Sequence, residues 1–346
     1  PGESSASIGG TIGTNAGGMH AVKYGVTRHH VLGLEAVLPS GEVIRTGGRY
    51  VKTSSGYDLT QLIIGSEGTL ALVTEAILKL RPRSVHQATM LAPFATLGDV
   101  ASAVPAIVAG GLDPLILEYL DMLAMASITA DGDLALGIPE RVRREALAYL
   151  VVIVENNSAE RLEADLEALG EMLTRLGADD VYLLPAATGR RLIEAREKAF
   201  WSAKAAGADD IIDIVVPRTA LPEFLAQVSE SAQHDGAIVA GCGHAGDGNV
   251  HLSVFQPEPA SRARLLRRLY QAGITLGGTV SGEHGIGTAK KQHFLQLEDP
   301  VKVDLMRRIK KAFDPDGLLN PGVIFDADRP PSHTPPLAGG KAGRQS

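Results

Sequence analysis

Apolar residues recur at spacings of three and four in several segments, which is the period of an amphipathic helix. The clearest case is RLEADLEALGEMLTRLG, where five leucines fall on one helical face. A later segment with this period ends at Asp314-Pro315, because the residue before a proline is disfavoured in helical conformation. The pattern predicts helices over 96–110, 158–177, 219–234 and 301–313.

Shorter apolar runs lie between these segments and have the length and composition of strands. The runs LILEYLD, AYLVVIVE and DIIDIVV predict three strands, and AIVAGCGH followed by VHLSVF predicts a hairpin. Nearer the start, 31–46 reads as another hairpin with its turn at Pro39-Ser40-Gly41. Tyr57–Ile64 suggests a short helix, and LALVTEAILKL a further strand. Alternating helices and strands indicate a sheet covered by helices.

The character of the chain changes at Arg81-Pro82-Arg83, where the helical segments begin. We therefore expect one unit over 1–82 and a second over 83–325. From Asp326 onward the chain has no periodicity and is rich in proline and glycine. Residues 326–346 are predicted to be a disordered tail.

The composition excludes some classes of function. The 346 residues are 45% hydrophobic and 21% charged, as in globular proteins. A net charge of −7 with 4% aromatic residues argues against nucleic-acid binding. The single cysteine, Cys242, has no partner for an internal disulfide, so a reducing compartment such as the cytoplasm is expected. No apolar run reaches the ~18 residues of a membrane-spanning helix.

Glycine is abundant, at 39 of 346 residues, and it clusters. GGTIGTNAGG (9–18) and GSEGTL (65–70) expose backbone N–H groups that side chains do not shield. Such loops wrap closely around phosphate groups. The alternative is a pair of turns that need positive φ; neither segment has the spacing of a dinucleotide or P-loop motif. Two such segments close together favour a cofactor that carries phosphate.

The segment CGHAGDGNVH suggests a metal site. If Asp247-Gly248 forms a type I′ turn, His244 and His251 lie directly opposite each other on adjacent strands. Downstream, Glu283 and His284 lie between glycines. Two histidines and a carboxylate are a common set for a divalent ion. The alternative is that these are hydrogen-bonded loop histidines, and Cys242 reads as a small buried residue.

Taken together in this order, the motifs closely resemble those of the FAD-linked 2-hydroxyacid dehydrogenases of the vanillyl-alcohol-oxidase flavin superfamily. The motifs span nearly all of residues 1–325. They are GGTIGTNAGG with Tyr24-Gly25, VLPSGEVIRTG, SSGYDLTQLIIGSEGTLALVTE, GHAGDGNVH, SGEHGIGTAKK and FDPDGLLNPG.

The resemblance implies an α+β fold: part of an FAD-binding domain, then an α/β cap with a ferredoxin-like sheet, then C-terminal helices. In the family another flavin-binding lobe precedes the position of Pro1, so this chain is expected to bind FAD poorly or not at all by itself. The residues implied to contact FAD are Gly9, Gly10, Thr14, Asn15, Gly17, Gly18, Gly65, Ser66, Glu67, Gly68, Thr69 and Asn320.

The resemblance also implies roles in catalysis. His244, His251 and Glu283 would hold a divalent metal (zinc, manganese or iron), and His284 would be the catalytic base. Arg196, in EAREKAFW, would bind the substrate carboxylate; the alternative is a solvated arginine on a helix surface. The implied reaction oxidises a 2-hydroxy acid to the 2-oxo acid, and electrons pass to another protein or a quinone. Partner subunits would place the protein at the inner membrane.

Departures from the family pattern concern the substrate. The 2-hydroxyglutarate enzymes carry asparagine where Ser253 stands and lysine where Ile211 stands, so a small acid such as lactate or glycolate is expected. Two other interpretations remain. One is a flavin-dependent alkylglycerone-phosphate synthase, although those enzymes have a histidine-rich run at 281–284 and Glu283 favours the dehydrogenase. The other is an inactive truncated fragment that binds only metal or partner subunits.

Overall fold

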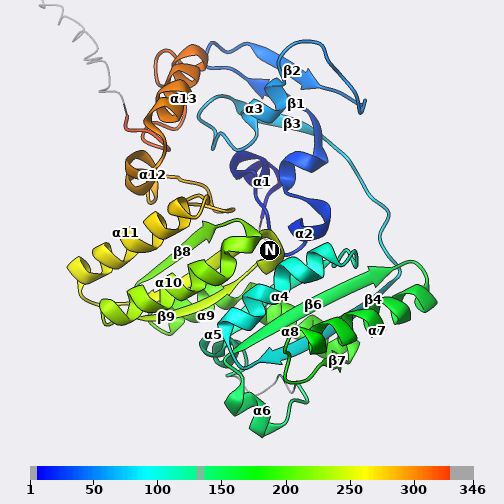
Figure 1. The fold of residues 1–346 in the computed structure, drawn as a ribbon. Helices are drawn as coiled ribbons and strands as arrows, with labels where there is room; N and C mark the ends of the chain where they lie inside the picture. The colour runs from blue at the N-terminus through cyan, green and yellow to red at the C-terminus, as the bar shows by residue number, and fades with distance from the viewer. Residues whose placement is uncertain (1–5, 131–133, 135, 328–346) are drawn as a thin grey trace, which may run out of the picture.

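The structure is a computed structural model that describes residues 6–130, 134 and 136–327. It contains a three-stranded sheet near the N-terminus and a seven-stranded sheet after it (Figure 1). Every strand pairing in both sheets is antiparallel. The tail predicted over 326–346 lies almost wholly outside the described residues.

The small sheet confirms the predicted N-terminal hairpin. Strands β1 (Val31–Val37) and β2 (Val43–Gly47) pair with each other, and β3 (Leu72–Leu78) pairs with the other edge of β1. The predicted short helix is α3 (Leu59–Ile63), and Asp58 caps it by accepting the N–H of Gln61 at 3.0 Å. A small apolar cluster joins this sheet to the helices beside it.

The large sheet has the strand order β7-β4-β6-β5-β9-β10-β8. The three strands and the hairpin predicted after residue 83 all form, whereas β4 and β7 were not predicted. The strands are β4 (His86–Phe94), β5 (Ile116–Asp121), β6 (Ala148–Asn156), β7 (Tyr182–Leu184), β8 (Asp210–Val215), β9 (Ile238–Gly243) and β10 (Asn249–Phe255).

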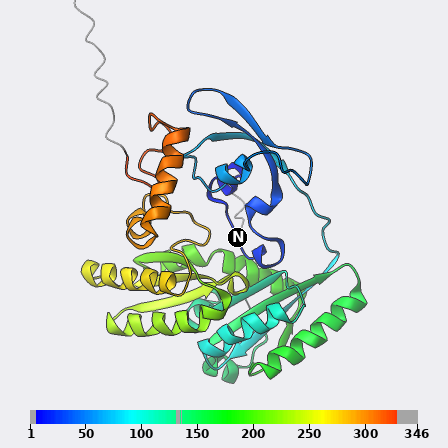
Figure 2. The same cartoon turned by 45° about the horizontal axis from the view of Figure 1, so that its top comes forward.

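One face of the large sheet is covered by four helices, on the side away from the N-terminal sheet (Figure 2). Three of them were predicted from their apolar spacing; α11 was not. Phe94, Tyr119 and Phe224 are among the largest fully buried side chains of the molecule. The helices are α4 (Leu97–Ala109), α7 (Ala159–Arg175), α10 (Leu221–His234) and α11 (Pro259–Thr275).

The opposite face is only partly covered by helices. An apolar cluster packs helices over the part formed by β4, β5 and β6. Over β8, β9 and β10, the N-terminal segment and the loop that follows α11 approach instead, and the candidate site lies there. The helices of this face are α5 (Met122–Ile128), α6 (Glu140–Glu145), α8 (Ala186–Glu197) and α9 (Ala199–Ala205).

The prediction of a continuous glycine loop over 9–18 was wrong for its first half. Residues Ile8–Thr14 form helix α1, because the Ser7 hydroxyl caps it by accepting the N–H of Gly10 at 3.0 Å and Ile12 is buried. Gly9, Gly10 and Thr14 are therefore helical. The loop begins at Asn15, which has a φ of 52°, and ends at helix α2 (Ala21–Tyr24).

The turn between β9 and β10 also differs from the prediction. His251 pairs with Cys242, not with His244, so the register is two residues away from the predicted one. Asp247 closes a 3-10 turn and only Gly248 has positive φ (73°), whereas a type I′ turn needs two such residues. A two-residue shift keeps every side chain on its face, and both histidines still face the same side of the sheet.

The C-terminal part returns to the N-terminal sheet. Helices α12 (Lys291–Leu297) and α13 (Pro300–Phe313) confirm the predicted C-terminal helices, and α13 ends before Asp314-Pro315 as expected. Lys310 Nζ donates to the carbonyl oxygen of Thr69 at 2.8 Å. Among the described helices, none has the length and apolar character needed to span a membrane.

Candidate functional site

Three predicted ligands meet at one point on the sheet. His244 follows β9, His251 lies on β10, and Glu283 comes from the loop after α11. The two Nε2 atoms are 3.3 Å apart, and Glu283 Oε1 lies 3.3 Å from His244 Nε2 and 3.2 Å from His251 Nε2. All three residues are buried. The structure therefore assembles the predicted set despite the different hairpin register.

These separations suit a metal ion. Nitrogen and oxygen ligands bind Zn²⁺ at about 2.0–2.2 Å in tetrahedral geometry, which places neighbouring ligand atoms about 3.3–3.6 Å apart. The three separations, 3.2–3.3 Å, lie within about 0.1 Å of that range. Two neutral imidazoles and a carboxylate favour a first-row divalent ion over Ca²⁺ or Mg²⁺, which prefer oxygen. The three residues therefore fit a first-row divalent metal ion such as zinc.

A second carboxylate orients the first histidine. Glu118, on β5, is completely buried and accepts a hydrogen bond from His244 Nδ1 at 2.5 Å. The other oxygen of Glu118 lies 2.9 Å from Arg196 NH2. Carboxylates in this position fix the ring and its tautomer in metal sites. Arg196 is only 4% exposed, so its interpretation as a solvated helix arginine was wrong.

Asp213, on β8, holds the loop that carries Glu283 and His284. Its Oδ2 accepts backbone N–H groups from Glu283 and His284, both at 3.0 Å. Lys290 Nζ lies 3.3 Å from the same oxygen, and Asn249 Nδ2 donates to Oδ1 at 2.7 Å. One buried carboxylate thus fixes the direction in which the loop presents its side chains.

The ionisation of the cluster follows from these contacts. Burial opposes a charged His244, but the carboxylates of Glu118 and Glu283 raise the pKa of His244 to about 9. Burial lowers the pKa of His251. Burial also opposes ionisation of Glu283, yet hydrogen bonds from His244 and His251 lower its pKa. Without metal, His244 is thus an imidazolium between two carboxylates.

His284 stands at the edge of this cluster and is accessible. Its side chain is 43% exposed, and its ring stacks on that of His251 with centroids 5.3 Å apart. His284 Nε2 lies 3.6 Å from Glu283 Oε1, and Nδ1 lies 3.7 Å from Asp213 Oδ2. An exposed imidazole beside a buried metal-type cluster is suited to exchange a proton with a bound molecule.

The glycine loop approaches the cluster directly. A Cβ on Gly17 would lie at contact distance, 3.6 Å, from Glu283 Oε2, so the loop backbone lies directly beside this ligand. Within the described chain, the N–H groups of Gly17, Gly18 and Met19 form no hydrogen bond. A cavity of about 540 Å³ opens beside them and is also lined by Thr11. Free consecutive N–H groups beside a cavity fit an anionic or polar cofactor edge.

The second glycine segment joins the first. The N–H of Glu67 donates to Gly13 O at 2.8 Å, and Asn320 Nδ2 donates to Glu67 O at 2.5 Å. The Glu67 carboxylate accepts the N–H groups of Ile286 and Gly287, both at 2.7 Å. These hydrogen bonds bring together three parts of the chain that were predicted to contact FAD, as a shared ligand would require. They are segments 9–18 and 65–69 and residue Asn320.

Some predicted cofactor residues use their side chains within the protein. Thr69 is 2% exposed and its hydroxyl donates to Ser66 O at 2.7 Å. Thr14 donates its hydroxyl to Gly10 O at 3.3 Å. Asn15 accepts the N–H of Arg28 at 3.0 Å. Gly65 and Gly68 have positive φ, of 79° and 67°, which supports the turn interpretation for those two positions.

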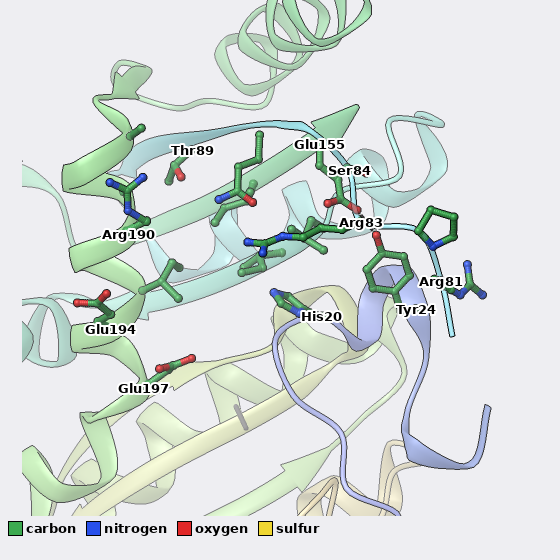
Figure 3. A pocket seen from close by; sticks show the side chains of 18 of the residues that line it. His20, Tyr24, Arg81, Arg83, Ser84, Thr89, Glu155, Arg190, Glu194 and Glu197 are labelled. Carbon is green, nitrogen blue, oxygen red and sulfur yellow. Dashed lines mark hydrogen bonds between the residues drawn. The ribbon is translucent and has the colours of Figure 1, made fainter. Parts of the chain in front are cut away.

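Two of the three ligands, His251 and Glu283, line a cavity of about 400 Å³ together with Arg196, His284 and Gly17. A larger cavity of about 580 Å³ lies beside α8 (Figure 3). There Tyr24 donates to Glu155, and Lys23 Nζ lies 3.3 Å from the same carboxylate. Burial and that hydrogen bond raise the pKa of Tyr24 to about 12. These contacts anchor α2, and with it the glycine loop, to β6.

Sequence comparison decides the family. The family of FAD linked oxidases, C-terminal domain, matches residues 83–324, and the FAD binding domain family matches residues 2–47. The chain belongs to the FAD-linked oxidoreductases. An uncharacterized FAD-linked oxidoreductase of Mycobacterium tuberculosis is 60% identical over 326 residues, which are 94% of this chain and 71% of that protein.

Two relatives of this FAD-linked oxidoreductase have named activities. The D-lactate dehydrogenase of Anaerostipes hadrus is 35% identical, over 94% of this chain and 70% of that protein. The glycolate oxidase subunit GlcD of Bacillus subtilis is also 35% identical, over 93% of this chain and 69% of that protein.

Solved structures confirm the predicted fold class. p-Cresol methylhydroxylase superposes with a TM-score of 0.66 at 16% identity, over 93% of this chain and 70% of that one. An alkyldihydroxyacetonephosphate synthase gives 0.62 at 14% identity, over 90% of this chain and 57% of that one. The fold is that of the vanillyl-alcohol-oxidase type; identities this low carry no information on substrate.

The sequence analysis missed Glu118 and Asp213. Each is a carboxylate in the middle of a strand, flanked on both sides by apolar or aromatic residues, in LILEYLD and DIIDIVV. Burying a charge is unfavourable unless it is paired, so an acidic residue inside a buried strand is itself a signal of a functional or paired site. That signal was present in the sequence.

Proposed function

We propose that this FAD-linked oxidoreductase oxidises a small 2-hydroxy acid, of the lactate or glycolate type, to the 2-oxo acid with the help of a divalent metal. The observation that supports it most is the convergence of His244, His251 and Glu283 at 3.2–3.3 Å, beside a cavity that His251 and Glu283 line together with Arg196 and His284. The relatives named D-lactate dehydrogenase and glycolate oxidase agree with this choice.

Zinc, manganese or iron at the three ligands would polarise the substrate's 2-hydroxyl, and FAD would accept the hydride. Arg196 holds a fixed positive charge at the cavity wall for the substrate carboxylate, and its own partner Glu118 sets its position. His284 accepts the hydroxyl proton, because it is exposed to the cavity and its loop is fixed by Asp213.

The segments implied to hold FAD remain part of the proposal. Gly17, Gly18 and Met19, whose N–H groups form no hydrogen bond within the described chain, line the 540 Å³ cavity, and Gly17 also lines the cavity of His251 and Glu283, which would bring the reacting end of the cofactor close to the substrate. The reduced cofactor would pass its electrons to another protein or to a quinone.

The test is an anaerobic absorption experiment. Protein loaded with FAD and zinc is mixed with glycolate or with D- or L-lactate, and the visible flavin bands are recorded. We expect them to bleach, and to remain unchanged after the metal is removed with a chelator. Bound flavin and bound metal with no bleaching by any of these acids would contradict the proposal.

A matched pair of histidine variants isolates the proposed base. His284→Asn is expected to slow bleaching by at least the ~100-fold typical of a lost general base. His86→Asn changes an exposed histidine at the start of β4, far along the chain from the cluster, and is expected to have no effect. Equal rates in both variants would remove His284 from the mechanism.

A further inference from the structure

The 400 Å³ cavity also has an aromatic wall, formed by Phe200 and Trp201. Phe200 and Trp201, in α9, form an edge-to-face pair with ring centroids 5.0 Å apart. They are 43% and 60% exposed, which is high for side chains of this size. Ile211 of β8 and Ser253 of β10 also line the cavity.

The charged and imidazole groups of the cavity have roles in the proposed function. The metal ligands, His284 and Arg196 would hold the carboxylate and the 2-hydroxyl of a substrate, which leaves Phe200 and Trp201 as the largest lining side chains for its remaining substituent. Apart from these groups, the lining residues that the structure describes include one charged side chain, the carboxylate of Glu197, and no further cation. A second carboxylate on the substrate would meet like charge and find no cation there.

We propose that the preferred substrate is a 2-hydroxy monocarboxylate whose side chain is apolar and longer than a methyl group, aliphatic or aromatic, and packs on Phe200 and Trp201. This rests on the proposed function and extends its substrate class beyond glycolate and lactate to 2-hydroxy monocarboxylates with longer apolar side chains. The cavity supports it, since a volume of about 400 Å³ lies within the 300–1,000 Å³ of sites for ligands much larger than lactate.

The expected gain in affinity can be calculated from the apolar surface that the substrate side chain buries. Each methylene that leaves water for the aromatic wall should tighten binding about fourfold. An aromatic side chain gains further from edge or offset contact with the two rings. The affinity should therefore rise from glycolate through lactate and 2-hydroxybutyrate to 2-hydroxy-4-methylpentanoate and 3-phenyllactate.

Trp201 provides the measurement, because it is the only tryptophan among the 346 residues. Zinc-loaded protein is titrated with each acid, and with 2-hydroxyglutarate, while tryptophan emission is followed. We expect dissociation constants that fall about fourfold per added methylene, a blue shift for the longer acids, and the weakest binding for 2-hydroxyglutarate. Equal affinities along the series, or tighter binding of 2-hydroxyglutarate, would overturn the inference.

Two variants test whether the rise in affinity with chain length depends on the aromatic wall. Phe200→Ala should weaken 3-phenyllactate about tenfold and leave glycolate within twofold. Leu183→Ala removes an exposed apolar side chain from the edge strand β7 and should change neither. Equal losses for both acids in Phe200→Ala would overturn the inference. A zinc-dependent response without a chain-length trend refutes this inference alone; no response to any acid contradicts the proposed function as well.

Discussion

The two faces of the seven-stranded sheet use the same strands for different purposes. Under α4, α7, α10 and α11 the strands present an uninterrupted apolar layer. On the opposite face, where β5, β8, β9 and β10 lie together, they present buried charged and imidazole groups. Because strand side chains alternate, adjacent residues belong to different layers.

The contrast is sharpest within β10. Leu252 is 1% exposed in the apolar core, and its neighbour His251 is a candidate metal ligand. In β8, Ile212 and Ile214 pack in the same core, and Asp213 between them fixes the loop of Glu283. The apolar face stabilises the fold, and that stability allows the other face to keep groups whose burial is unfavourable by itself.

The largest effect is expected from removing a ligand on the site face. His251→Ala should weaken zinc binding by more than about 100-fold, beyond the 10–100-fold that outer partners contribute. Competition with a zinc indicator dye measures this directly. Unchanged affinity would mean that the three residues do not bind the ion.

Leu252, which is next to His251 but on the apolar face, should show the opposite pattern, a loss of stability without a loss of zinc affinity. Leu252→Ala leaves a cavity in the core and should lower the free energy of unfolding by about 2–5 kcal/mol. Denaturant titration measures the loss. Zinc affinity of the folded protein should stay within about twofold, and a large change in affinity would show that the faces are not independent.

Glu118→Gln tests the partner of His244. It should weaken zinc binding about 10–100-fold, because the imidazole loses the carboxylate that orients it. Glu155→Gln is the matched control, since Glu155 lies on β6 of the same sheet but contacts Lys23 and Tyr24. The same loss of affinity in both variants would indicate a general effect of sheet carboxylates.

The pH dependence should report His244. Its pKa is raised to about 9 in the metal-free protein, so zinc must displace a proton below that pH. Apparent zinc affinity should rise about tenfold per pH unit from pH 7 to 9. The stability of the metal-free protein should fall over pH 6.5–9, because the native imidazolium loses its proton. Chemical denaturation across this range measures the free energy of unfolding. The control is His244→Gln, in which this decrease in stability with pH should be absent.

The smallest effect concerns only the apolar face. Ser158 caps α7 by accepting the N–H of Arg161 at 3.3 Å. Ser158→Ala should lower the free energy of unfolding by about 1 kcal/mol. Thermal denaturation measures it, and zinc affinity should not change. A measurable loss of zinc affinity would again couple the two faces.

Periodicity predicted the elements that have a strong pattern. The leucine spacing of α7 and the apolar runs of β5, β6 and β8 were sufficient. It missed α11, in which four arginines interrupt the apolar residues and leave only a narrow apolar stripe. In α1, glycine suggested a loop, and the Ser7 cap with the buried Ile12 outweighed that preference.

The site was predictable as a set of residues but not as a geometry. The ordered motifs identified His244, His251 and Glu283, whereas their contacts depend on a loop fixed by Asp213 from a distant strand. The hairpin register was wrong by two residues, and the shared face survived only because the shift is even. Pairings such as Glu118 with His244, 126 residues apart, arise from tertiary packing.

The most direct test of the account is X-ray absorption at the zinc edge of the loaded protein. The account predicts one shell of about four nitrogen and oxygen atoms at about 2.0–2.1 Å, with the outer-shell signature of two imidazoles. The His251→Ala variant should lose one imidazole contribution. A sulfur scatterer at about 2.3 Å, which would place Cys242 on the metal, or the absence of imidazole would contradict it.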